Sequence, residues 1–333
     1  WMTFTKCWNF YSQKMTAESP DYKDSLNFVF ANTQEEESIY PLTIGEIAEA
    51  QSEDADLTSL VKADKYKKQL VEDIEVYCKD GKLVIPKHLH RRAVEWYHQR
   101  LLTAPDAKEA REYLRTRGLS GDVARQFRLG WAPDAWDALS SDLGVGVELL
   151  RDCGLAFTNS RGRLQDSFRA RVMFPIFKDS GEPVAFGGRV LPGSTDPAKY
   201  KNSAESKIYA KSKTLYGLNW AKSDVVKADQ IVVCEGYTDV IGFHRIGFTR
   251  AVATCGTALT EDHVRLMKRF ANNVVLAFDA DAAGQGAAER FYEWERKIDI
   301  QVKVARLSGG KDPGDLADSD PQGLLAAVEQ PEA

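Results

Sequence analysis

Two stretches of the sequence decide the fold: Gln230-Ile-Val-Val-Cys-Glu-Gly-Tyr-Thr-Asp239 and Asn273-Val-Val-Leu-Ala-Phe-Asp-Ala-Asp281. Each begins with a short apolar run rich in β-branched residues, which predicts a buried strand. Each run leads directly into a carboxylate, Glu235 in the first stretch and Asp279 in the second. The two stretches therefore predict strands that carry acids at their carboxyl ends.

The residues around these stretches continue an alternation of strand and helix. We predict helices over 238–245, 262–270 and 282–297, and further strands over 251–254 and 301–305. Helices of this length between short apolar strands indicate a mainly parallel sheet with right-handed crossovers. The sequence thus predicts an α/β domain over residues 226–320.

The acids at the strand ends suggest a site for a divalent cation. In an open parallel sheet, ligands bind outside the carboxyl ends of the strands. Alternation along an extended chain would place Asp279 and Asp281 on one face, where they repel each other unless a cation lies between them. Oxygen ligands suit Mg²⁺ or Mn²⁺, and Asp312 and Asp315 offer more of them. A single acid at a strand end can equally be only the N-cap of the helix that follows. The interpretation as a metal site therefore rests on the combined pattern of acids after several strands.

Residues 103–225 predict a mixed α+β subdomain. Helical patterns lead into two strand-like runs, 171–177 and 183–190, which we expect to pair antiparallel. The chain has a net charge of -5, yet residues 161–213 hold eleven Lys or Arg against five Asp or Glu. Such a local basic block is typical of a phosphate-binding surface. A solvent-exposed face without a ligand would show the same charge pattern.

The first hundred residues are acidic and weakly apolar, and we expect an irregular segment there. A hairpin is predicted around Asp80-Gly81 and a helix over 87–102, whose His88, His90 and His98 we interpret as solvated. The five cysteines form no Cys-x-x-Cys pair, which argues against a zinc site and a disulfide framework. No apolar run is long enough to span a bilayer, and no signal peptide is recognised.

Two motifs carry a family resemblance. Glu235-Gly236-Tyr237-Thr238-Asp239-Val240, together with residues 278–284, resembles the Toprim domain shared by bacterial primases, topoisomerases and some nucleases. Four basic or glycine-rich motifs before it, at 168–176, 186–189, 199–203 and 211–218, resemble the RNA-polymerase core of the DnaG-type replicative DNA primase. The resemblance covers roughly residues 103–327, in the family's order.

The resemblance implies a nucleotidyltransferase that makes short RNA primers on single-stranded DNA by two-metal chemistry, in the bacterial cytoplasm. Its implied catalytic residues are Glu235, Asp279 and Asp281. Mg²⁺ or Mn²⁺ would be held by these three with Asp239, Asp312 and Asp315. Ribonucleoside triphosphates and template would contact Arg171, Arg189, Lys199, Tyr200, Asn202, Lys211 and Lys213. For Tyr200 and Asn202, a core aromatic and a turn residue remain open alternatives.

The sequence departs from the family in several places. Asn202-Ser203-Ala204-Glu205-Ser206 stands where the family usually shows Asn-Ser-Pro-Glu-Thr, and Gly314 stands where many relatives have a second acid.

Residues 77–98 resemble a segment of Ty3/gypsy-like retroelement polyproteins, so we expect residues 1–102 to be a separate segment. The family's zinc-binding and helicase-binding domains, and hence the replicative helicase as partner, are expected to be missing here. A catalytically impaired chimeric primase fragment, a Toprim-type nuclease or a silent nucleic-acid-binding protein are the alternatives.

Overall fold

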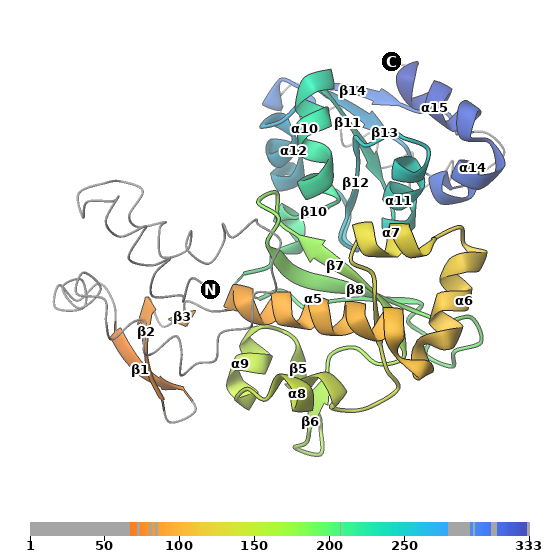
Figure 1. Ribbon diagram of the computed structural model, residues 1–333. Helices are drawn as coiled ribbons and strands as arrows, with labels where there is room; N and C mark the ends of the chain where they lie inside the picture. Colours follow the sequence, from red (N-terminus) through yellow and green to blue (C-terminus); the bar gives the residue numbers. More distant parts are fainter. Residues whose placement is uncertain are drawn as a thin grey trace, which may run out of the picture.

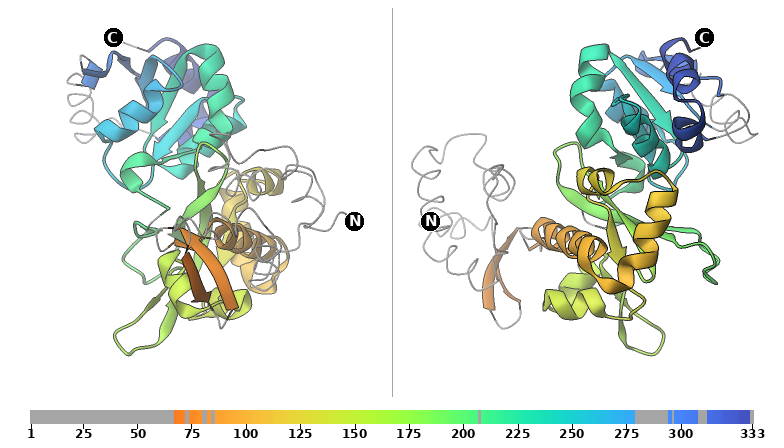
Figure 2. Two further views of the ribbon diagram at one scale, coloured as in Figure 1. Left: turned by 90° about the vertical axis from the view of Figure 1, so that its left-hand side faces the viewer. Right: turned by 45° about the vertical axis from the view of Figure 1, so that its right-hand side comes forward.

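The computed structural model describes residues 67–71, 74–79, 82–83, 86–206, 208–278, 294–295, 297–307 and 312–331. Two sheets dominate it: a mainly parallel sheet with helices on both faces, and an antiparallel sheet next to it (Figure 1). Figure 2 shows the same two parts from further sides. No helix among the described residues is long and apolar enough to cross a membrane.

The parallel sheet confirms the predicted α/β domain. Its strands lie in the order β10-β12-β11-β13-β14, and only β10 runs antiparallel to its neighbour. The strands are β10 (Leu215–Tyr216), β11 (Gln230–Cys234), β12 (Ala251–Thr254), β13 (Asn273–Leu276) and β14 (Gln301–Val304). The helices around it are α10 (Leu218–Ala228), α11 (Tyr237–Arg245), α12 (Glu261–Lys268), α14 (Pro313–Ser319) and α15 (Pro321–Glu329).

Alternation along β11 explains why helices cover both faces of this sheet. Val232 and Cys234 pack in the cluster that includes α11, α14 and α15. Ile231 and Val233 pack in the cluster that includes α10 and α12. All four side chains are fully buried, as expected for a central parallel strand.

The antiparallel sheet has the order β4-β7-β8-β9. Its strands are β4 (Gly130–Ala132), β7 (Arg171–Phe177), β8 (Pro183–Val190) and β9 (Tyr200–Asn202). The predicted pairing of β7 with β8 is confirmed, with Arg171 opposite Val190 and Phe174 opposite Gly187. Smaller elements complete this part: η1 (Pro105–Ala107), α6 (Lys108–Thr116), α7 (Gly121–Gln126), α8 (Ala138–Leu143), α9 (Val147–Asp152), β5 (Ala156–Thr158), β6 (Leu164–Asp166) and η2 (Lys211–Lys213).

Helix α5 (Pro86–Thr103) crosses the domain boundary that we predicted at residue 102. Its apolar stripe, including Leu89, Ala93 and Tyr97, is buried in one cluster with β8. The rings of Tyr97 and Phe186 meet edge-on with centroids 5.3 Å apart. An amphipathic helix must cover its apolar face, and the antiparallel sheet supplies the partner. Helix α5 therefore packs in the body of the fold, on both sides of the boundary predicted at residue 102.

The same packing corrects the prediction that the histidines of this helix are solvated. His90 and His98 are each 1% exposed. His90 stacks on Phe186, and Nδ1 of His98 lies 2.6 Å from the carbonyl oxygen of Leu129, to which it donates. Burial lowers the pKa of His98, which favours the neutral ring. His88 lies in α5, but its side chain is outside the described residues.

Before α5, a three-stranded antiparallel sheet contains the predicted hairpin. β2 (Ile74–Lys79) pairs with β3 (Lys82–Leu83), with Cys78 opposite Leu83. β1 (Lys67–Val71), which we did not predict, pairs with the other edge of β2.

Candidate active site

Glu235 stands exposed directly after β11, at the carboxyl end of the parallel sheet. β13 lies beside β11, with Val233 opposite Leu276 and the amide of Ala277 donating to the carbonyl of Val233 at 2.9 Å. The chain of β13 therefore runs out of the sheet next to Glu235. The predicted acids Asp279 and Asp281 come after β13 in the sequence and lie outside the described residues.

Asp239 is buried and ties the loop after β11 to helix α14. Its Oδ2 accepts from the amide of Gly236 at 2.9 Å, and its Oδ1 accepts from the amide of Gly314 at 3.3 Å. A carboxylate that accepts from a helix N-terminus stabilises the start of that helix. Asp239 thus holds the two motifs together, a role that the sequence pattern did not predict.

Asp312 caps α14 and lies close to Asp239. Its Oδ1 accepts from the amide of Asp315 at 2.7 Å. A Cβ atom on Gly314 would stand 3.2 Å from Oδ1 of Asp239 and 3.3 Å from Oδ1 of Asp312. The same glycine backbone lies against Gly242, so its missing side chain lets α14 approach α11 closely. Gly314 therefore occupies the narrow space between two carboxylates. It is the position where many members of the family have a second acid.

This donor set fits a hard divalent cation. Glu235, Asp239 and Asp312 all offer carboxylate oxygens, the ligands that Mg²⁺ and Mn²⁺ prefer. In the part of the chain that the structure describes, no three acidic, histidine or cysteine side chains come close enough to form a metal cluster. The predicted set also includes Asp279 and Asp281, which lie outside the described residues.

Asp315 forms an ion pair with the residue that ends helix α6. Its carboxylate lies 3.0 Å from the guanidinium of Arg117, directly after α6. Burial alone would lower the pKa of Arg117, but Asp315, Tyr113 and Asp312 nearby raise it above its ordinary value. Arg117 lies outside the basic block at 161–213, and for that reason the charge count missed it.

Arg189, on the interior strand β8 of the antiparallel sheet, lies close to two tyrosine rings. Its guanidinium carbon is 4.6 Å from the ring centre of Tyr113 and 5.6 Å from that of Tyr200. Tyr200 is 41% exposed, and Lys199 beside it is exposed as well. Arginine with aromatic rings and lysine can contact phosphates and bases, and that role stays a prediction for these residues.

Arg171 occupies a different environment from the one we predicted. It is 2% exposed, and its guanidinium donates to the carbonyl of Gly188 at 3.1 Å and to that of Ala198 at 2.9 Å. It also donates to Asp196 at 2.7 Å. These partners hold the segment between β8 and β9, whereas the sequence predicted a direct phosphate contact for Arg171.

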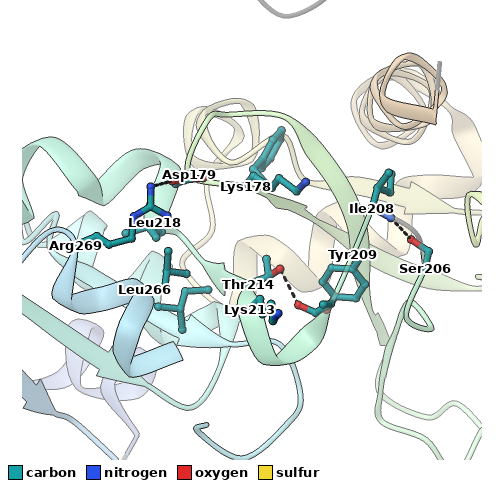
Figure 3. A pocket seen from close by; sticks show the side chains of 13 residues that line it. Lys178, Asp179, Ser206, Ile208, Tyr209, Lys213, Thr214, Leu218, Leu266 and Arg269 are labelled. Carbon is teal, nitrogen blue, oxygen red and sulfur yellow. Dashed lines mark hydrogen bonds and ion pairs between the residues drawn. The ribbon is translucent and has the colours of Figure 1, made fainter. Parts of the chain in front are cut away.

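Lys211 and Lys213 lie in η2, beside α12 of the parallel sheet. The carbonyl of Lys211 accepts from His263 at 2.7 Å, which fixes the backbone of η2. Lys213 lines a cavity of about 260 Å³, with Lys178 and Arg269 also in its wall (Figure 3). Among the described residues, none of the predicted carboxylates lines this cavity.

Two known families match the sequence, in chain order. The DNA primase catalytic core, N-terminal domain, matches residues 96–222, and the Toprim-like family matches residues 232–317. A DNA primase of Streptomyces coelicolor is 40% identical over 235 residues, which are 68% of this chain and 36% of that relative. The chain thus spans little more than a third of the length of that curated relative.

Solved structures share the fold of most of this chain. The RNA polymerase domain of Mycobacterium tuberculosis primase DnaG is 35% identical, with a TM-score of 0.70 over 76% of this chain and 85% of that one. A DnaG primase catalytic domain bound to single-stranded DNA is 37% identical, with a TM-score of 0.69 over 74% of this chain and 78% of that one.

Proposed function

This chain belongs to the family of DnaG-type bacterial DNA primases, and we propose that it synthesises short RNA primers on single-stranded DNA. In the proposed reaction, the 3′-hydroxyl of one ribonucleotide attacks the α-phosphate of the next, and pyrophosphate leaves. The observation that carries the proposal is the position of Glu235, exposed at the carboxyl end of β11 where β13 leads into the Asp279–Asp281 motif.

The carboxylates would hold Mg²⁺ or Mn²⁺. We assign Glu235, Asp279, Asp281 and Asp312 as the ligands, with Asp239 fixing the loop that presents Glu235. Such ions, when bound, neutralise charge on the phosphates and lower the pKa of the attacking hydroxyl. The carboxylates of this chain orient that hydroxyl and the α-phosphate relative to each other. Asp315 contributes through its ion pair with Arg117.

The basic and aromatic residues near the acids would bind the nucleotides and the template. Arg189 on β8 and Lys199 and Tyr200 at the start of β9 offer two cations and one exposed ring. Lys211 and Lys213 offer further positive charge from η2. Single-stranded nucleic acid is generally held by this combination of phosphate contacts and stacking. A related catalytic domain has been solved bound to single-stranded DNA, which supports a similar template for this chain.

The proposal places the activity in the bacterial cytoplasm, in concert with a replicative helicase. The resemblance of residues 77–98 to retroelement polyproteins stays a prediction, and α5 contributes to the primase fold whatever its ancestry. Cleavage of nucleic acid by a Toprim-type nuclease is the competing activity, because the same carboxylates would serve it.

Primer synthesis by the full chain tests the proposal. The purified chain is incubated with Mn²⁺, labelled ribonucleotides and single-stranded DNA, beside the variants Asp279→Ala and Glu109→Gln. Glu109 is an exposed acid of α6 and serves as the matched control. Short RNA products that disappear only with Asp279→Ala support the proposal. Degradation of the DNA without ribonucleotide-dependent products would establish the nuclease instead.

A further inference from the structure

The side-chain amide of Asn202 is held at both of its ends. The hydroxyl of Tyr237 donates to Oδ1 of Asn202 at 2.7 Å. Nδ2 of Asn202 donates to the carbonyl oxygen of Cys255 at 3.0 Å. A carbonyl only accepts hydrogen bonds, so this contact fixes which end of the amide carries the nitrogen. The amide therefore has one orientation, with Oδ1 toward Tyr237.

These two hydrogen bonds join three elements from both sheets. Asn202 is the last residue of β9 in the antiparallel sheet. Tyr237 is the first residue of α11, directly after Glu235 and Gly236, and Cys255 directly follows β12. One side chain thus connects the antiparallel sheet to the chain leaving two neighbouring strands of the parallel sheet.

Two glycines make room for this connection. Gly187 lies opposite Asn202 in the β8–β9 register, and a Cβ atom there would overlap the ring of Tyr237. Gly256 has a φ of +72°, and a Cβ atom there would overlap Nδ2 of Asn202. A larger residue at either position would displace Asn202 from Tyr237 or from Cys255. Glycine at both positions therefore leaves the space that these hydrogen bonds require.

The Tyr237 end of the contact is buried, while Asn202 is partly exposed. Tyr237 is 4% exposed, and its ring packs against Phe174 and Tyr216 with centroid distances of 5.5 and 4.5 Å. A buried polar group that loses its hydrogen-bond partner cannot turn to water instead. The hydroxyl of Tyr237 and the amide of Asn202 therefore act as a unit.

We propose that Asn202 and Tyr237 are positioning residues that set the distance between the nucleotide-binding edge and the metal-binding acids. This inference rests on the proposed primase activity. Tyr200, which packs by Arg189, is two residues before Asn202, and Glu235 is two residues before Tyr237. In this proposal Asn202 acts through Tyr237, whereas the sequence predicted a direct nucleotide contact for it.

A double-mutant cycle tests whether the two side chains act as a unit. Urea unfolding midpoints are measured for the full chain and for Tyr237→Phe, Asn202→Ala and the double variant. Tyr216→Phe is the matched control, because it removes a neighbouring buried hydroxyl that has no hydrogen-bond partner among the described residues. We expect the double variant to shift the midpoint by less than the sum of the single shifts. Strict additivity, or a Tyr237→Phe shift no larger than that of Tyr216→Phe, would overturn the proposal.

Kinetics then separate positioning from nucleotide contact. For Tyr237→Phe we expect kcat for primer synthesis to fall about tenfold, because small displacements of reacting groups are costly, while the ribonucleotide KM changes less than twofold. Tyr216→Phe should retain the wild-type kcat. An Asn202→Ala variant whose KM rises tenfold while Tyr237→Phe stays at wild-type rates would show a direct nucleotide contact and refute positioning. If the wild-type chain makes no primers, the proposed function and the catalytic part of this inference both fail, while the unfolding cycle still decides whether the pair is coupled.

Discussion

The guanidinium of Arg117 lies 3.0 Å from the carboxylate of Asp315, and this ion pair joins the end of α6 to the first turn of α14. The two side chains are 37% and 47% exposed. An exposed pair of this kind stabilises a fold by about 1 kcal/mol at most. The ion pair matters more for position than for stability, because it holds the positively charged Arg117 side chain next to the helix that Asp312 caps.

This geometry predicts different effects for two acids of the site. Glu235→Gln should reduce primer synthesis by about a hundredfold or more, because it removes a metal ligand at the reacting centre. Asp315→Asn should reduce it by less than about tenfold, since the carboxylate is engaged by Arg117. Initial rates at saturating ribonucleotide and Mn²⁺ measure both. An Asp315→Asn variant as impaired as Glu235→Gln would place Asp315 among the metal ligands.

Substitution of two arginines of the basic block should affect different properties, the free energy of unfolding in one case and DNA binding in the other. Arg171→Met leaves Asp196 and two carbonyl groups without their donor, so we expect a loss of about 2–4 kcal/mol in the free energy of unfolding. Arg189→Met should leave that free energy within about 1 kcal/mol and weaken binding to single-stranded DNA. Chemical denaturation and a fluorescence binding titration measure the two quantities. Equal loss of stability in both variants would contradict this division of roles.

The space at Gly314 predicts a metal-dependent stability in one variant. Gly314→Asp adds a carboxylate within reach of Asp239 and Asp312, so we expect a lower Tm without metal. Mg²⁺ should raise the Tm of this variant more than it raises the Tm of the wild type. Gly314→Asn, of equal size but uncharged, separates repulsion from crowding. If Mg²⁺ raises the Tm of Asp and Asn variants equally, the added acid does not reach the site.

His244 of α11 should make the fold sensitive to acid. Its two ring nitrogens are buried with no hydrogen-bond partner among the described residues, and burial lowers its pKa to about 4. The neutral ring is favoured by folding, so this contribution is complete above pH 6.5 and is lost as the pH falls toward 4. The full loss is on the order of 3 kcal/mol.

The variant His244→Leu should show a smaller decrease in unfolding free energy between pH 7 and pH 4.5 than the wild type. His98 and His263 also have lowered pKa values, so part of the decrease will remain. Urea denaturation at the two pH values provides the comparison. An unchanged pH dependence in the variant would show that His244 does not titrate in this range.

Local sequence patterns were enough to predict the strands that position the site. The apolar runs of β7, β8, β11 and β12 match the observed strands residue for residue, because each is bounded by polar or turn-forming residues. The position of Glu235 after β11 followed from the same pattern.

Long-range partners could not be read from the sequence. Arg171 counted as one cation of a basic block, and its burial depends on Asp196, which is 25 residues further along the chain. The amide of Asn202 finds its partners at Tyr237 and Cys255, 35 and 53 residues away. Such contacts are decided by how the two sheets pack, and no local spacing reports them.

Helix α5 also determines how short a working version of this protein can be made. A chain that begins at residue 103 would lack Leu89, Ala93, Tyr97 and Leu101, and would expose the apolar surface of β8 that they cover. Large exposed apolar patches promote aggregation, so such a truncation would fail for reasons unrelated to catalysis. The smallest stable unit starts at or before Pro86, inside the segment whose sequence looked foreign to the rest.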